Sequence, residues 1–559
     1  MSYCLYAPAL TEKMNQCERH GVEMRSREKL RVAVLLDSEV QPAWLYAMLE
    51  KIKALNFVEF CLRIKQAPPA LSDASPVLWR LYRYADDRLF GRVSDALAMR
   101  DVSELLHGVP LREIDLAASD NENFSKHNID VVLDIVGGLD PAALTGMARY
   151  GIWRYEFGDA PLRDPSVVGR REVFDEAPLT VSRLLSHLPD GQVVCLIRSQ
   201  SRTVPFSPRR NRDNAYWKSA AFASRALAAL HQSQTIPNVL VAISDNDDAR
   251  QKGFNMAAAL ARVSANLLGR GLQKLKSVDQ WIVAFKFETE PSLPHTLSGF
   301  QSMMPPKDRF WADPFPIERD GRYFVFIEEL PFATNKGYIS VMEVRLDGSW
   351  TQPVKVLERD YHLSYPFLFE WQGDLFMLPE TGQNRTVEVY RCHRFPDDWR
   401  LESVLLENVN SADATLAHIG DCWWMFVNIG EAGTELYDEL HLYHADQPFG
   451  PWVPHRNNPV KSDARSARPA GNLFWLEGQL YRPAQCCVPL YGSALSLNRV
   501  ECIDAETFNE QPVAQLTPDW RPGLLGAHTF NRAGLLTVVD GFQRTPRFGT
   551  VENKLEITP

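Results

Sequence analysis

The sequence contains little cysteine, and its cysteines form no pattern typical of a metal or redox site. Nine cysteines occur among 559 residues, and no two of them make a C-x-x-C pair. So few cysteines are typical of a reducing compartment, and we expect the protein to be cytoplasmic. We expect neither a metal nor a cofactor.

Long apolar runs and an excess of positive charge are also missing. No stretch of about 18 apolar residues occurs, and the N-terminus mixes charged and apolar residues instead of forming a basic head and an apolar segment. We therefore expect neither a membrane span nor a secretion signal. The 60 Lys and Arg against 70 Asp and Glu give a net charge of -10, so we expect no nucleic-acid partner.

The composition is that of a folded globular protein with more than one core. Apolar residues make up 45% and charged residues 23%, which excludes disorder and low-complexity sequence. The length corresponds to about three to four domains of about 150 residues.

After a tail over 1–29, the sequence over 30–205 alternates between apolar strand patterns and helical patterns. This alternation predicts an open α/β sheet. Its expected strands are 31–37, 58–64, 130–136, 151–157, 179–185 and 193–199, with helices at 44–55, 77–90 and 141–149. Ligands of such sheets bind beyond the carboxyl ends of the strands. The positional candidates are Asp37, Gly137, Gly138, Gly158 and Asp159. No G-x-G-x-x-G follows the first strand and no G-x-x-x-x-G-K-[ST] occurs, so no phosphate-binding motif supports a nucleotide site.

The order of these elements, with the segments ARYGIWRYEFGD, EVFDEAPLTVSRLL and LPDGQVV, resembles formyltransferase-like domains. In that family a strand carries an Asn-x-His pair, and Tyr155, Glu156 and Phe157 occupy that region here, while Asp190-Gly191 matches part of a later turn. An active site would need the missing imidazole and carboxamide. The resemblance therefore implies a degenerate formyltransferase-like fold with a docking or structural role. A helical connector over 206–279 is expected to follow, with helices at 212–231 and 247–276.

From residue 280 to 559 the sequence changes to short aromatic-rich strands broken by glycine turns. Five segments of the same kind open at Asp313, Tyr365, Asp413, Arg468 and His528, between 48 and 60 residues apart. Units of about 50 residues that cannot bury an apolar face alone predict a β-propeller, here with five blades. The segment WIVAFKF (281–287) is the expected closing strand.

Propeller geometry predicts a site at one mouth of the pore. The first strand of each blade begins at the face where the antiparallel second strand ends. The strand openers should therefore meet a second polar set, which comprises Glu328 with Glu329, Glu380, Asn428, Gln485 and Asp540.

Carboxylates across a polar pocket suit chemistry at an anomeric carbon, where one group acts as base or nucleophile and another as acid. We predict Asp313 and Glu380 as the principal catalytic carboxylates, assisted by Asp413. The apolar residues before Glu380 could raise its pKa by desolvation. The expected substrate-binding residues are Glu328, Glu329, Tyr365, Arg468, Arg482, Gln485, Tyr491, His528 and Asp540.

Two resemblances bear on this interpretation. The Ala312-Asp313-Pro314 opening resembles five-bladed furanosidases such as glycoside hydrolase family 43, which implies a base at Asp313 and a pKa-tuning role for Asp413. Arg468 departs from that family, because it stands where a general-acid Glu is expected. The motifs FWADPF, YPFLF with MLPE, DATL, RPAGN with LYRPAQCC, HTF and VVDG resemble the propeller of plant glucosamine inositolphosphorylceramide transferase. They also resemble bacterial proteins that join this propeller to a formyltransferase-like domain.

The sequence leaves several functions open. The preferred one is a glycosyltransferase of surface-glycan or glycolipid biosynthesis, acting on a sugar-nucleotide or lipid-linked sugar at the pore mouth. The alternatives are a furanosidase-type glycoside hydrolase and a non-catalytic protein of glycan recognition or assembly.

Overall fold

The computed structural model describes residues 28–65, 77–90, 95–113, 127–137, 146–158, 160–161, 168–236, 256–290, 292–431 and 433–547. The chain divides into two compact units, an N-terminal and a C-terminal one, between Ser264 and Ala265. The short segment Gly430–Glu435 belongs to the N-terminal unit. Most of the expected tail, residues 141–145 of the expected helix at 141–149, Gly138 and Asp159 lie outside the described residues, and the described residues 146–149 form a turn instead of a helix.

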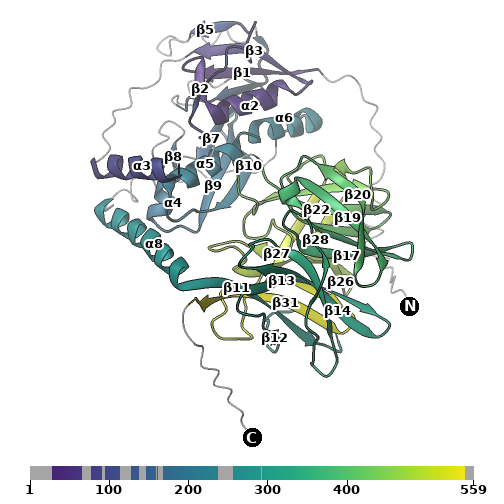
Figure 1. The fold of residues 1–559 in the computed structure, drawn as a ribbon. Helices are drawn as coiled ribbons and strands as arrows, with labels where there is room; N and C mark the ends of the chain where they lie inside the picture. The colour runs from purple at the N-terminus through teal and green to yellow at the C-terminus, as the bar shows by residue number, and fades with distance from the viewer. Residues whose placement is uncertain are drawn as a thin grey trace. The chain divides into compact units, whose positions relative to one another are not determined.

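The N-terminal unit is built on an eight-stranded mixed sheet with the order β10-β9-β7-β6-β1-β3-β5, and β8 pairs with β7 (Figure 1). The strands β7, β6, β1, β3 and β5 are parallel, and β9 and β10 are antiparallel. The bounds are β1 Leu30–Leu36, β3 Val58–Lys65, β5 Leu111–Glu113, β6 Val131–Asp134, β7 Ile152–Phe157, β8 Ala160–Pro161, β9 Leu179–His187 and β10 Val193–Arg202. A separate pair joins β2 (Val40–Pro42) to β4 (Met99–Asp101). The six principal strands lie where the alternating pattern predicted them.

The helices that lie entirely within the described part of this unit are α2 Ala43–Lys53, α3 Val77–Phe90, α4 Arg170–Phe174, α5 Pro208–Ser219 and α6 Phe222–Ser233. Helix α5 begins where sequence rules place a helix start, because the Ser207 hydroxyl accepts a hydrogen bond from the Arg210 N–H and Pro208 fills the first position. Residues of α5 and α6 pack in the same core as Trp44 and Tyr155. This packing assigns α5 and α6 to the α/β unit, although the sequence analysis placed them in a connector.

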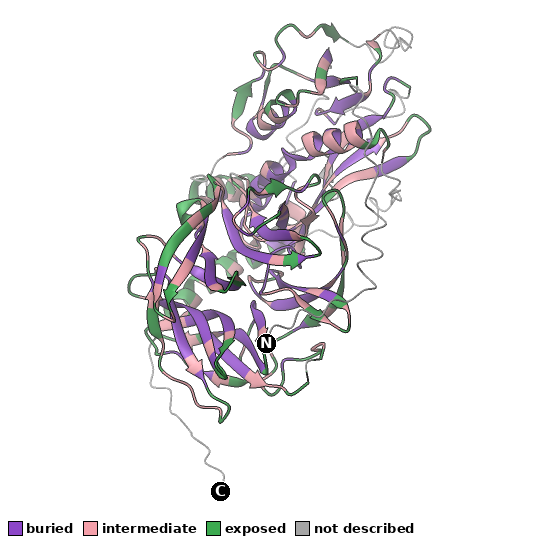
Figure 2. Ribbon diagram, turned by 90° about the vertical axis from the view of Figure 1, so that its right-hand side faces the viewer, coloured by how far each residue is buried: buried purple, intermediate pink, exposed green. Residues whose placement is uncertain are grey.

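The C-terminal unit is a five-bladed β-propeller, as the repeats predicted. Four sheets contain strands that are consecutive in the chain. Their strands are β13 Arg309–Arg319, β14 Arg322–Pro331, β15 Tyr338–Val344 and β16 Val354–Leu357; β17 Ser364–Trp371, β18 Asp374–Glu380, β19 Thr386–Arg394 and β20 Asp398–Glu407; β21 Ser411–Ile419, β22 Cys422–Ile429, β23 Glu439–Ala445, β24 Val453–Pro454 and β25 Lys461–Ser462; and β26 Phe474–Leu476, β27 Gln479–Cys486, β28 Ala494–Ile503 and β29 Phe508–Leu516. The inner strands are buried and the outer strands exposed (Figure 2).

The fifth blade joins the two ends of the propeller sequence. Its order is β12-β11-β31-β30, with β11 Ser277–Phe287, β12 Gln301–Met303, β30 Phe530–Ala533 and β31 Leu536–Pro546. Strand β11 pairs with β31 along its whole length, from Ser277 opposite Pro546 to Phe287 opposite Leu536. The expected closing strand is therefore confirmed. Helix α8 (Met256–Lys276) runs directly into β11 (Figure 1).

Glycine turns set the register of the blades. In three blades the first hairpin turns through two residues with positive φ, at Asp320-Gly321, Gln372-Gly373 and Glu477-Gly478. Two-residue turns of this kind match the right-handed twist of the strands that they connect. They fix which residues of the first and second strands face each other.

We expect the closing strand to belong to the cooperative core of the propeller. Phe285 of β11 is 2% exposed and packs in one cluster with Trp311 and Val325 of the first blade. Phe285→Ala should lower the free energy of unfolding by roughly 3–5 kcal/mol, measured by denaturant titration. The control Asp279→Asn changes an exposed residue of the same strand, paired only with Arg544 at 3.5 Å, and should cost less than about 1 kcal/mol. Equal stability of the two variants would place β11 outside the cooperative core.

Candidate functional site

The strand register brings the two predicted polar sets together at one mouth of the propeller. Ala312 pairs with Glu328, Ser364 with Glu380 and Ala412 with Asn428. In the fourth blade the Gln485 N–H donates to the carbonyl of Arg468 at 2.8 Å. Each second-strand residue thus lies beside the opener of its own blade.

Three openers share an unusual backbone conformation. Asp313, Tyr365 and Asp413 have φ values of 50°, 46° and 53°, and each lies in a bulge of the first strand. A bulge redirects a side chain, and positive φ at a residue other than glycine costs about 1–3 kcal/mol. The same strained position recurs in three blades, so the structure holds these openers in place at a cost in stability.

Asp313 connects the first, second and fifth blades. Its Oδ2 accepts from the Tyr365 N–H at 3.1 Å and its Oδ1 accepts from the Thr529 hydroxyl at 2.7 Å. Its own N–H donates to Asp540 Oδ2 at 3.1 Å. Asp540 also lies 2.5 Å from His528 Nδ1, and His528 Nε2 lies 3.6 Å from Asp313 Oδ1.

Asp413 and Arg468 form the second half of the site. Arg468 Nε donates to Asp413 Oδ2 at 2.6 Å and Nη2 to Oδ1 at 3.3 Å, which is a two-pronged contact between guanidinium and carboxylate. The Gln485 amide donates to the same Asp413 Oδ2 at 2.7 Å. Arg468 Nη2 reaches Glu380 Oε2 at 3.4 Å. The Glu380 side chain is 19% exposed, against 2% for Asp413, so Glu380 is the carboxyl of this pair that a ligand can reach.

An aromatic group lies beside these charges. Trp281 of the closing strand stacks on His528 with ring centroids 3.8 Å apart. The Arg468 guanidinium lies over the Tyr491 ring at 5.1 Å, and the Tyr491 ring meets His528 edge-on at 5.5 Å. Sequence reasoning found Tyr491 but missed Trp281 and Thr529. The only available signal for Trp281 was its place in the closing strand, and Thr529 follows the opener His528.

Burial shifts the acid-base properties of the site. Burial raises the pKa of Asp313 to about 6, helped by the charges of Asp413 and Asp540 and opposed by His528. Burial, with the charges of neighbouring carboxylates, raises the pKa values of Glu328 and Glu380 well above their ordinary range. The pKa of His528 is also raised: burial lowers it, but the charges of Asp540 and Asp313 outweigh burial. Both shifts favour the protonated form of the Glu328 and Glu380 carboxyls.

Three predicted binding residues have their polar groups engaged within the protein. Glu329 accepts from Arg309 and Ser340, both at 2.7 Å, and Arg482 donates to Glu510 at 2.6 Å. Tyr365 is fully buried, and its hydroxyl lies 2.9 Å from the Thr415 hydroxyl and accepts from the Gly471 N–H at 2.6 Å. The structure brings the other nine predicted residues together, namely Asp313, Glu328, Glu380, Asp413, Arg468, Gln485, Tyr491, His528 and Asp540.

Asp313, His528 and Asp540 place one ligand-type atom each within 4.8 Å of one another, the spacing of a possible metal site. Asp540 Oδ1 accepts from the His528 and Thr529 N–H groups, and Oδ2 accepts from the Asp313 N–H and faces His528 Nδ1. Both oxygens are already saturated, so this trio does not fit a metal ion.

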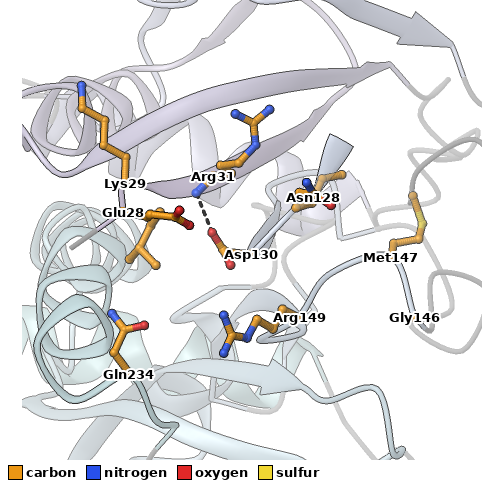
Figure 3. Close-up of a pocket in the computed structure, with 11 residues that line it drawn as sticks. Glu28, Lys29, Arg31, Asn128, Asp130, Gly146, Met147, Arg149 and Gln234 are labelled. Atoms are coloured by element: carbon orange, nitrogen blue, oxygen red, sulfur yellow. Dashed lines mark hydrogen bonds between the residues drawn. The ribbon is translucent and has the colours of Figure 1, made fainter. Parts of the chain in front are cut away.

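The N-terminal unit has a separate cavity of about 740 Å³ (Figure 3). It lies at the amino ends of β1 and β6, where the Arg31 N–H donates to Asp130 and where Arg149 and Gln234 form part of the wall. Ligands of open α/β sheets bind at the opposite edge. This cavity therefore does not coincide with the positional candidates Asp37, Gly137 and Gly158.

Together, the fold and the site define a five-bladed β-propeller with an acidic, aromatic-lined pore mouth. Residues 296–522 match the family model described as glucosamine inositolphosphorylceramide transferase 1, N-terminal. The protein named Glucosamine inositolphosphorylceramide transferase 1 in Oryza sativa subsp. japonica is 35% identical over 208 residues, which is 36% of this chain and 28% of the rice protein. The Arabidopsis thaliana protein of the same name is 30% identical over 208 residues, 36% of this chain and 27% of that protein. The chain thus matches less than a third of the length of these curated relatives.

Among solved structures, the chain is similar to Zg3597, a family 117 glycoside hydrolase from the marine bacterium Zobellia galactanivorans. The TM-score is 0.31 at 12% identity, and the similarity covers 47% of this chain and 90% of that one.

The raised pKa of Glu328 predicts a pH-dependent stability. A folded-state pKa above the unfolded value means that the folded protein binds the proton more tightly, so stability is lost as pH rises above the ordinary Glu range. Glu328→Gln keeps a neutral group, so its melting temperature should exceed that of the wild type by a margin that grows from pH 4 to pH 8. Each unit of pKa elevation contributes about 1.4 kcal/mol.

Glu329→Gln is the matched control. It changes the adjacent residue, whose side chain points to the other face of the strand and pairs with Arg309. This variant should be destabilised and should show no growing gain at high pH. A Glu328→Gln variant that is less stable than wild type at pH 8 would contradict a raised pKa at Glu328.

Proposed function

We propose that the propeller is a carbohydrate-active module whose pore mouth acts on a glycosyl bond. The observation that carries this proposal is the pairing of two kinds of carboxyl in one buried ring. Burial and neighbouring carboxylates raise the pKa of Glu380 well above its ordinary range, and its side chain is partly accessible, whereas the pKa of Asp313 is about 6, below neutral pH. Chemistry at an anomeric carbon uses one acid and one base or nucleophile of this kind.

In this proposal Glu380 protonates the leaving oxygen and Asp313 acts as base, or as nucleophile. Asp413 is held by Arg468 and Gln485, so its charge raises the pKa of Glu380 without needing to contact the substrate. Tyr491 is the partly exposed ring of this aromatic group and supplies an apolar surface against which a sugar ring can pack, while the buried Trp281 supports it edge-on. Among the described residues the Asn428 carboxamide and the Gln485 carbonyl oxygen are buried without hydrogen-bond partners, and sugar hydroxyls could satisfy them.

The reaction that we favour is glycosyl transfer in the synthesis of a surface glycan or glycolipid, from a sugar-nucleotide or lipid-linked donor. The family match supports this class, because the relatives are named as transferases that act with glucosamine and inositolphosphorylceramide. Hydrolysis is the alternative reaction at the same carboxylates. Arg468, which opens the fourth blade, argues against hydrolysis, because this cation stands in the place of the general acid of a furanosidase.

A specific observation favours a second candidate, a non-catalytic glycan-recognition module. Both carboxylate oxygens of Asp313 already accept hydrogen bonds, from Tyr365 and Thr529, and its side chain is only 7% exposed. A carboxylate with a purely structural role would have the same hydrogen bonds and the same burial.

Neutral substitutions separate the two candidates. If the site is catalytic, Asp313→Asn and Glu380→Gln should each lower turnover by roughly a hundredfold or more, the usual scale for a positioned acid or base. Activity is measured with a panel of sugar-nucleotide and lipid-linked sugars, and binding by calorimetry.

Glu370→Gln, an exposed residue of the same blade, is the control and should leave turnover unchanged. Melting temperatures confirm that each variant is folded. Unchanged turnover in folded Glu380→Gln and Asp313→Asn would move the chemistry elsewhere. Sugar binding without turnover, weakened by both changes, would support the recognition module.

We also propose that the N-terminal unit is a formyltransferase-like fold without formyl transfer. Tyr155 and Phe157, which stand in the Asn-x-His region, are core residues packed against Trp44, and Glu156 pairs with Arg183 at 2.6 Å. These side chains cannot polarise a formyl donor. Incubation with a folate formyl donor and amino sugars should give no formylated product by mass spectrometry, and a product lost on Asp190→Asn would contradict this.

A further inference from the structure

Helix α8 has an exposed apolar stripe over its second half. Leu268, Leu272 and Leu275 follow the i, i+4, i+7 spacing of one helix face and are 65%, 46% and 67% exposed, and Leu267 beside them is 37% exposed. Single exposed leucines are ordinary, but four within nine residues of one helix form a patch that marks an interaction site.

The charged residues of the helix itself are all positive. The helix from Met256 to Lys276 contains two lysines and two arginines and no carboxylate, in a chain whose net charge is -10. Lys274 and Lys276 are exposed next to the leucines.

The end of β31 adds two further cations, Arg544 and Arg547, both exposed. The Arg547 N–H donates to the Lys276 carbonyl at 2.9 Å, which fixes this strand end against the helix terminus. One acid, Asp279, pairs with Arg544 at 3.5 Å. The patch formed by the four leucines with Lys274, Lys276, Arg544 and Arg547 lies wholly within the unit that begins at Ala265.

No helix among the described residues is long and apolar enough to cross a bilayer. An amphipathic helix with leucines on one face and lysines beside them has a different use, because it can lie in the interface of a membrane with its apolar face among the acyl chains. Its cations then meet anionic headgroups.

We propose that this patch docks the protein on the surface of an anionic membrane. The positive charge of the patch favours an anionic membrane over a second copy of α8 as its binding partner. Two helices that pair usually match cations with carboxylates across the seam, and α8 offers no carboxylate for that purpose. Anionic lipid headgroups complement both the lysines and the neighbouring arginines. The proposal is independent of the chemistry proposed for the pore mouth.

The test is co-sedimentation of the full chain with vesicles of phosphatidylcholine alone and of phosphatidylcholine mixed with phosphatidylglycerol. The protein should bind the anionic vesicles and leave the neutral ones largely free, and high salt should weaken the binding. Leu268→Gln with Leu272→Gln should lower the partition coefficient by roughly tenfold or more for each leucine. Lys274→Glu with Lys276→Glu should lower it by at least about fivefold for each lysine.

Leu346→Gln is the matched control, because Leu346 is 66% exposed in a propeller turn far along the sequence, and its loss should leave vesicle binding unchanged. Melting temperatures of all variants should equal that of the wild type, since the altered side chains are exposed. Absence of binding to anionic vesicles would overturn the proposal. A dimer in analytical ultracentrifugation that Leu268→Gln with Leu272→Gln dissociates, without vesicle binding, would assign the patch to a second copy instead.

Discussion

One carboxylate joins the two ends of the propeller. Asp313 receives hydrogen bonds from Tyr365 in the second blade and Thr529 in the fifth, while its own N–H binds Asp540 of the fifth blade. It does so with φ at 50°, a conformation that persists only where surrounding contacts enforce it. Because the same residue links three blades and lies at the pore mouth, a loss of turnover in Asp313→Asn is informative only together with an unchanged melting temperature and the same loss in Glu380→Gln. Glu380 can be tested more cleanly, since it is partly exposed.

The acidity of the pore mouth follows from the limited number of cations that the blades supply. Five carboxyl groups of the described residues converge there, of which Arg468 binds Asp413 and the His528 ring, whose pKa is raised by these carboxylates, binds Asp540. The remaining acids are Asp313, Glu328 and Glu380, and burial with mutual repulsion raises the pKa of each. The raised pKa values favour protonation of Glu328 and Glu380, whereas Asp413 and Asp540 are balanced by ion pairs and Asp313, with a pKa of about 6, titrates close to neutral pH. A site of this kind holds donors and acceptors of protons together at neutral pH.

Much of this arrangement could be predicted from the sequence, because blades repeat and the repeats align. The openers were identified from the aligned repeats and the second-strand ends from the antiparallel geometry of each blade, and the register confirms that Ala312 faces Glu328 and Ser364 faces Glu380. The sequence prediction failed where the alternation of side chains along a strand decides which face a residue occupies. Glu329 follows Glu328 and Arg482 lies three residues before Gln485, so both side chains point to the opposite face of their strands.

Other features depend on closure and packing, which a linear pattern does not encode. Trp281 reaches His528 because β11 and β31 pair across more than 250 residues of sequence. The α5 sequence is polar enough to suggest a connector, yet Asn211, Asp213 and Lys218 are buried because they bond within the α/β unit. The exposed leucines of α8 were invisible in the helical pattern, since only the folded chain shows which face remains uncovered.

The position of α8 gives the membrane proposal a consequence for the glycosyl proposal. The helix ends at Lys276 and the closing strand begins at Ser277, with no loop between them. A helix lying on a membrane would therefore restrict the distance and orientation of the fifth blade, which carries His528 and Asp540. A propeller held near a bilayer in this way would meet lipid-linked sugars at a high effective concentration. Free sugar-nucleotides would gain no effective concentration from the same arrangement. A rate enhancement on anionic vesicles that is confined to lipid-linked substrates would therefore connect the two proposals. Without such an enhancement, the two proposals would remain separate.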